Sequence, residues 1–184
     1  PTDIRSAIEC LAIAHLLPWA TDALDEAAWW QTLDRLLGIV GAVEDWPIDC
    51  ELPPEQVLLH QLLAGELPLT LAHLFPEIKC CHQLREQAAR NVSENISELT
   101  NGQGMIRGTY LDWFALLLAS WARCEALARP SKKCSLDADA REQLEWTATQ
   151  ALRLTAQNGA PILSGAKAAP LTADVLAAVL QTAG

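Results

Sequence analysis

The chain has 184 residues and a mass of 20.0 kDa, and 51% of its residues are hydrophobic and 20% charged. This composition is typical of one folded domain rather than a disordered chain. With 13 basic and 23 acidic side chains the net charge is −10, which argues against nucleic acid and against an anionic membrane surface as partners. The sequence shows no apolar stretch of the roughly 18 residues that a membrane span needs. It shows no basic region before the apolar run Cys10–Leu17, so no signal peptide is predicted.

Helical periodicity runs through the first half of the chain, broken by proline, glycine and capping residues. Thr21 or Asp22 is expected to cap the second helix, and Gly41 to mark its end. Gly65 is expected to close the third helix, and Pro68 to open a short fourth one. The expected helices of this half cover residues 3–17, 22–40, 53–65 and 68–75.

The second half continues with the same periodicity. One helix carries an apolar stripe at spacings of three and four, opposite a polar side. The next is apolar nearly all round, which is typical of a central helix. Residues 160–170 are rich in alanine, proline and glycine and predict a linker before a last short helix. The expected helices of this half cover residues 76–99, 109–128, 136–157 and 172–182.

These elements predict an all-α fold of seven to eight helices. Short connections make neighbouring helices antiparallel, so we expect stacked helical hairpins. Residues 1–184 are expected to form a single domain. Because the chain starts at Pro1 and not at methionine, we expect a piece of a longer protein.

Cysteine and histidine patterns predict neither a metal site nor a cofactor. The six cysteines contain no C-x-x-C motif, and the adjacent Cys80 and Cys81 would point about 100° apart on a helix. They are best interpreted as small buried side chains, and their usage favours a reducing compartment such as the cytoplasm. No H-E-x-x-H, G-x-S-x-G or P-loop pattern is present.

The loop from Gly102 to Gly108 and the start of the following helix hold the strongest candidates for chemistry. Arg107 is followed by Tyr110, the only tyrosine in the chain. A cation beside a phenol could bind a carboxylate and move a proton. The alternative is a helix entry with a tyrosine that fills the core. His73 is a further candidate for proton transfer.

Tryptophans suggest a second possibility. Trp113 and Trp121 are eight residues apart, hence on one face of a helix, and Arg123 follows them. Flat aromatic faces of this kind could stack on sugar rings. Packing in the core is the alternative.

Four stretches lie between residues 65 and 159 of the chain: Gly65–Glu77 (GELPLTLAHLFPE), Glu98–Gly104 (ELTNGQG), Trp121–Cys124 (WARC) and Ala151–Gly159 (ALRLTAQNG). Together they resemble the N-terminal helical region of bacterial heparinase II/III-like proteins. None of them is a catalytic signature. The resemblance implies part of an (α/α) toroid, normally followed by β-sandwich domains.

By the same resemblance, the protein would act on or bind acidic polysaccharide by lyase chemistry. In such a β-elimination the candidates, chosen by residue type and not by a motif match, are Tyr110 as the proton-transfer group and Arg107 as the partner of the uronate carboxylate. Trp113, Trp121 and Arg123 are the candidates for binding substrate. The isolated chain is expected to be inactive, because a β-domain would complete the cleft. The alternative is a non-catalytic all-α module that packs on another domain or protein.

Overall fold

The computed structural model describes residues 3–43, 46, 52–129, 135–156 and 172–182, and within them the fold is all-α with no strand, as predicted. A lone bridge joins Thr100 to Ile106. The helices are α1 (Ile4–Leu16), α2 (Glu26–Val43), α3 (Pro54–His60), α4 (Leu67–Leu74), α5 (Lys79–Leu99), α6 (Phe114–Ala128), α7 (Ala138–Arg153) and α8 (Ala173–Thr182). They are extended by two 3₁₀ segments, η1 (Leu17–Asp22) and η3 (Gly108–Trp113), and one π-helical segment, η2 (Gln61–Glu66).

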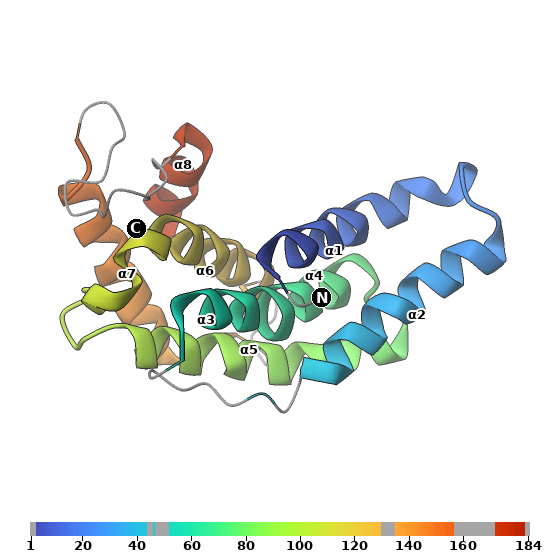
Figure 1. Cartoon of the computed structure of the whole chain (residues 1–184), viewed down its shortest axis with the longest axis horizontal. Helices are drawn as coiled ribbons and strands as arrows, with labels where there is room; N and C mark the ends of the chain where they lie inside the picture. Colours follow the sequence, from blue (N-terminus) through green and yellow to red (C-terminus); the bar gives the residue numbers. More distant parts are fainter. Residues whose placement is uncertain (1–2, 44–45, 47–51, 130–134, 157–171, 183–184) are drawn as a thin grey trace.

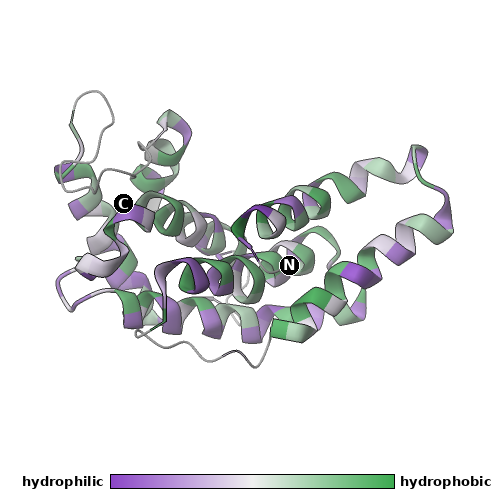
Figure 2. Cartoon of the chain, viewed as in Figure 1, coloured by the Kyte–Doolittle hydropathy of each residue, from purple (hydrophilic) through white to green (hydrophobic). Residues whose placement is uncertain are grey.

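The helices pack around a central rod made of α3, η2 and α4. Helix α5 runs along this rod, and α1 lies over its other side (Figure 1). Helices α1 and α2 form an antiparallel hairpin whose turn projects from one end of the molecule, while α6, α7 and α8 gather at the other end (Figure 1). Hydrophobic residues dominate the central rod, and hydrophilic residues mark the outer sides of the helices around it (Figure 2).

The central rod differs from the prediction, which broke it at Gly65 and Pro68. The backbone stays helical from Pro54 to Leu74. It widens at η2, where the N–H of Leu67 donates to the carbonyl of Leu62, five residues back. This π-helical turn accommodates Pro68, which has no N–H to donate.

Two contacts with α5 explain the residues that looked like helix breakers. Pro68 cannot bind the carbonyl of Ala64, and Asn91 Nδ2 donates to that oxygen instead at 3.0 Å. A Cβ on Gly65 would lie 2.8 Å from Val92 Cγ2, so glycine here permits the close approach of two helices rather than ending one. The side chains that decide this lie 27 residues away in the sequence, and local rules could not find them.

Pro54–Leu74 is also the one segment of the described chain that is long and apolar enough to cross a membrane, judged on length and composition. The sequence-based interpretation missed it because it divided the segment at Gly65. Within the structure, 89% of its most apolar window is buried. Every residue from 57 to 72 is buried against the surrounding helices, so this segment is the central helix of the core.

Other boundaries moved by a few residues. The cap of α2 is Asp25, whose Oδ1 accepts from the N–H of Ala28 at 2.8 Å, rather than Thr21 or Asp22. Gly41 lies inside α2, and α5 begins at Lys79 rather than at Pro76. The expected linker over residues 160–170 lies outside the described residues.

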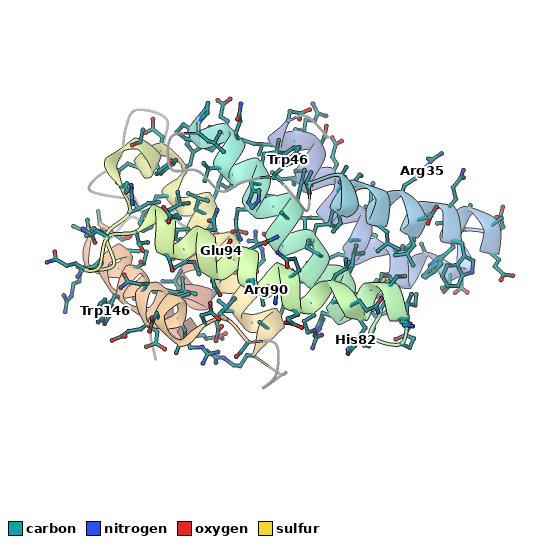
Figure 3. The ribbon with its side chains drawn as sticks, turned by 90° about the horizontal axis from the view of Figure 1, so that it is seen from below. Arg35, Trp46, His82, Arg90, Glu94 and Trp146 are labelled. Carbon is teal, nitrogen blue, oxygen red and sulfur yellow. The ribbon has the colours of Figure 1, made fainter. Side chains whose placement is uncertain are left out.

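The amphipathic pattern of α5 is confirmed. Its predicted apolar stripe faces the core, with Cys81, Val92 and Ile96 fully buried. Arg90 and Glu94 lie on the outward face of the helix (Figure 3). The spacing of three and four therefore predicted correctly which face of this helix is buried.

Gly104 is expected to tolerate no side chain. Its φ of 71° is in the left-handed region, and a Cβ would lie 2.6 Å from the backbone carbon of Trp146. Gly104→Ala should cost about 2 kcal/mol in urea unfolding, through backbone strain and steric overlap. Gly102→Ala is the matched control, because a Cβ there meets nothing within 4 Å; equal losses for the two variants would contradict this expectation.

Candidate functional site

The predicted proton-transfer pair is not assembled at the surface. Tyr110 lies in η3 with 1% of its surface exposed, whereas Arg107 is exposed. The pocket beside this loop is lined by neither of them. Its walls are mostly apolar and include Met105, Leu111 and Phe114. A phenol buried in this way has no access to a polysaccharide bound outside.

The predicted substrate-binding residues are also separated. Trp121 is fully buried, and its Nε1 donates to Asn95 Oδ1 at 3.0 Å. A sugar platform needs an exposed ring face, so Trp121 is a core residue. Trp113 is half-buried and packs against the core, and His73 is exposed in the last turn of α4.

Arg123, one of the predicted substrate-binding residues, forms an ion pair with a buried carboxylate. Its Nε and Nη2 donate to the two carboxylate oxygens of Glu66 at 2.5 and 2.9 Å. The Glu66 side chain is only 3% exposed, whereas that of Arg123 is 46% exposed. Burial disfavours the charged guanidinium, but the hydrogen bonds and charge of Glu66 outweigh it, and the pKa of Arg123 is raised. The buried carboxylate thus holds the guanidinium with one edge in solvent.

A groove of about 360 Å³ surrounds this ion pair. One wall is α1, the floor is α3 and η2, and the other wall is α6. Apart from the ion pair and His15, its lining is apolar. The lining residues are Ile4, Ile8, Leu11, Ala12, His15, Leu58, Leu62, Glu66, Leu116 and Arg123.

The lining residues follow helical spacing along α1 and along the floor of the groove. On α1 the stripe begins at Ile4 and Ile8 and ends at His15, and Ile8 is 48% exposed. On the floor, Leu58, Leu62 and Glu66 are four residues apart. Parallel ridges at this spacing leave a trough that fits another helix.

Sequence reasoning missed Glu66, although a signal was present. It is the only Asp, Glu, Lys or Arg between residues 57 and 72, in a run that is otherwise apolar or neutral. A lone charge in a buried helix must find an opposite charge on a neighbouring helix. Arg123, on the apolar sixth helix, is one such partner, but the sequence does not say which faces meet.

A second buried carboxylate ties α6 to α7. Glu125 is 3% exposed, and its Oε1 lies 3.2 Å from Arg141 Nε and 3.5 Å from Arg129 Nε. Arg141 reaches it from the first turns of α7, and Arg129 from the end of α6. This cluster fixes the packing of the two helices and lines none of the pockets described above.

The described cysteines with buried thiols lack the character of nucleophiles. Burial raises the pKa of the Cys81 thiol to about 12. Burial likewise raises the pKa of Cys124 well above its usual value. A nucleophilic cysteine needs a lowered pKa. Among the described residues, no group of three or more His, Cys, Asp or Glu side chains could hold a metal ion.

His60 is expected to make the protein less stable in mild acid. Its ring is 4% exposed, and Nε2 lies 3.1 Å from the carbonyl oxygen of Trp46. The oxygen can only accept, so Nε2 carries the proton; Nδ1 is buried with no hydrogen-bond partner in the described structure. Burial lowers the pKa of His60 from 6.5.

The unfolded chain therefore takes up this proton first as the pH falls below about 6.5. The free energy of unfolding should decline from pH 7 through the lowered pKa, by at most about 1.4 kcal/mol per pH unit. Urea unfolding between pH 7.5 and 5.5 measures this, and His60→Gln should flatten the profile. His73→Gln, at an exposed histidine, is the control; an unchanged profile in His60→Gln would contradict the assignment.

Comparisons with known proteins add no relative. No family model matches the chain, and no curated protein or solved structure shows a significant match to it.

Proposed function

We propose that this protein is a non-catalytic helical module that binds an amphipathic helix in the groove between α1 and α6. The observation that carries the proposal is the apolar groove with the half-exposed Arg123 fixed at its floor by Glu66. Amphipathic helices bind such grooves through apolar side chains at spacings of three and four residues. The bound helix would complete the bundle around the central rod.

The positive charge of Arg123 determines which amphipathic helix binds the groove most tightly. Arg123 Nη1 makes no hydrogen bond within the described structure, so it can donate to a carboxylate on the bound helix. His15, at the end of the α1 stripe, can add a second donor. The preferred ligand is therefore a helix with an apolar stripe and an acidic residue facing Arg123.

The test uses three fluorescent 16-residue peptides that share one leucine stripe. They carry glutamate, glutamine or lysine at the position that faces Arg123. Fluorescence anisotropy should rank their affinities in that order, with about a tenfold difference between the glutamate and lysine peptides. Absence of binding by all three, or the reverse order, would overturn the proposal.

Two isoleucines on α1 provide matched variants. Ile8 lines the groove and is 48% exposed, whereas Ile13 is 44% exposed and does not line it. Ile8→Glu should weaken binding of the glutamate peptide at least about tenfold, because it places a charge in the apolar trough. Ile13→Glu should leave the affinity within about twofold.

Lyase chemistry on acidic polysaccharide, with an (α/α) toroid, stays a prediction from the resemblance to heparinase II/III-like proteins. Its candidate residues Tyr110, Arg107 and Trp121 do not share a cleft in the described structure. The isolated chain is expected to release no unsaturated uronate product from acidic polysaccharides. Ultraviolet absorbance of such a product would show that the isolated chain is a lyase.

A further inference from the structure

The turn between α1 and α2 concentrates exposed apolar side chains. Four of the ten large hydrophobic residues exposed in the described chain lie between residues 16 and 30. Trp19 is 83% exposed, the highest value among them, and Leu16 is 64% exposed. They belong to the end of the hairpin that projects from the molecule (Figure 1). We define the hairpin tip as Leu16, Trp19, Leu24 and Trp30.

The tip is held in place by partly buried contacts of Trp29. Trp29 Nε1 donates to the carbonyl of Leu17 at 2.9 Å, which joins α2 to η1. The Trp29 ring also packs edge-on against Phe75 at the end of α4, with centroids 5.5 Å apart. A surface that is ordered before binding loses little entropy when a partner docks.

A pocket of about 350 Å³ opens at this tip. It is lined by Leu24, Trp29 and Trp30, with Thr21 and Glu26 supplying the polar groups. Trp30 is 49% exposed and its ring meets that of Trp29 at 4.9 Å in an edge-to-face arrangement. The pocket thus combines aromatic surface with one carboxylate.

The chain segment that forms the pocket carries acidic groups and no lysine or arginine. From residue 13 to residue 30 the chain carries Asp22, Asp25 and Glu26 and no lysine or arginine. The whole chain has a net charge of −10, so a second copy would be repelled, as would an anionic membrane. A basic partner is favoured by the same charges.

We propose that the hairpin tip docks a segment of another protein that presents lysine or arginine beside an apolar side chain. The apolar side chain packs on Leu24, and the cation lies against the Trp30 ring and near Glu26. Cations bind favourably to tryptophan faces, and a neighbouring carboxylate adds to the attraction. This surface is separate from the α1–α6 groove and does not depend on the function proposed for it.

Binding of a 12-residue peptide that alternates arginine and leucine tests the proposal, with a peptide in which glutamate replaces each arginine as its counterpart. The arginine peptide should bind, and the glutamate peptide should not. Trp30→Ala should weaken binding of the arginine peptide at least about fivefold. The matched control is Trp146→Ala: this tryptophan is 41% exposed and lies on α7, away from the hairpin (Figure 3).

Each outcome of the binding experiment either supports or overturns docking at the hairpin tip. Equal losses in the two tryptophan variants would show general attraction to an acidic chain and would overturn the proposal. Binding to phosphatidylcholine vesicles that Trp30→Ala abolishes, without binding of the arginine peptide, would assign the tip to a membrane surface instead. Loss in Trp30→Ala alone, with the urea midpoint unchanged, would support it. Ile8→Glu should leave this affinity unchanged, which separates the tip from the groove.

Discussion

Replacing Trp121 by alanine is expected to lower the free energy of unfolding by about 3–5 kcal/mol. The side chain is fully buried in α6, so the change removes the largest buried side chain and leaves a cavity. It also removes the hydrogen bond to Asn95 Oδ1, so this buried oxygen is left without that donor. Urea unfolding followed by circular dichroism measures the loss.

Trp19→Ala is the control for this experiment, because Trp19 is 83% exposed. It should change stability by no more than about 0.5 kcal/mol. Trp121→Phe should fall between the two variants, since it keeps much of the ring volume and loses the hydrogen bond. A loss below about 1 kcal/mol in Trp121→Ala would contradict the packing of α6 against α5 described above.

Removing Arg123 alone is expected to cost about 3 kcal/mol, because it leaves the Glu66 carboxylate buried without a partner. Arg123→Met keeps an unbranched apolar side chain, similar to the aliphatic stem of arginine, and removes the charge. The loss should appear in urea unfolding at pH 7. Since Arg123 is half-exposed, water can reach the position that its guanidinium leaves. The loss of stability should therefore lie at the lower end of the range for breaking a buried ion pair.

The double variant Glu66→Leu, Arg123→Met separates this cause from a loss of packing. With both charges gone, no buried carboxylate remains unpaired, and stability should return to within about 1 kcal/mol of the parent. A double variant as unstable as Arg123→Met would show that the guanidinium stabilises the fold by packing and not by neutralising Glu66.

Much of the fold could be predicted because the helices are amphipathic. The stripe on α5 correctly predicted a helix and its buried face, and the apolar pattern of α6 correctly predicted a largely buried helix. The central place expected for α6 is taken instead by the rod of α3, η2 and α4. The central rod was predicted wrongly because Gly65 and Pro68 are breakers by local rules. Their neighbours on α5, Asn91 and Val92, supply the missing donor and the close contact, and such tertiary effects are invisible to local propensity.

The candidate site could be predicted only in part. Arg123 was identified, but as a binder of substrate, and its partner Glu66 was not considered. Tyr110 and Trp121 each had two interpretations, as a binding-site residue or as a core residue, because tyrosine and tryptophan serve both; the structure places both in the core. Their burial follows from how α5, α6 and η3 meet, which depends on contacts between distant residues.

Hydrogen–deuterium exchange of the chain with and without the glutamate peptide tests docking in the groove most directly. The backbone amides of α1 should exchange more slowly when the peptide is bound, because α1 forms one wall of the groove and carries exposed residues along its length. Amides of α7 should be unaffected, since α7 does not line it. Protection that appears on α7 and is missing from α1 would contradict docking between α1 and α6.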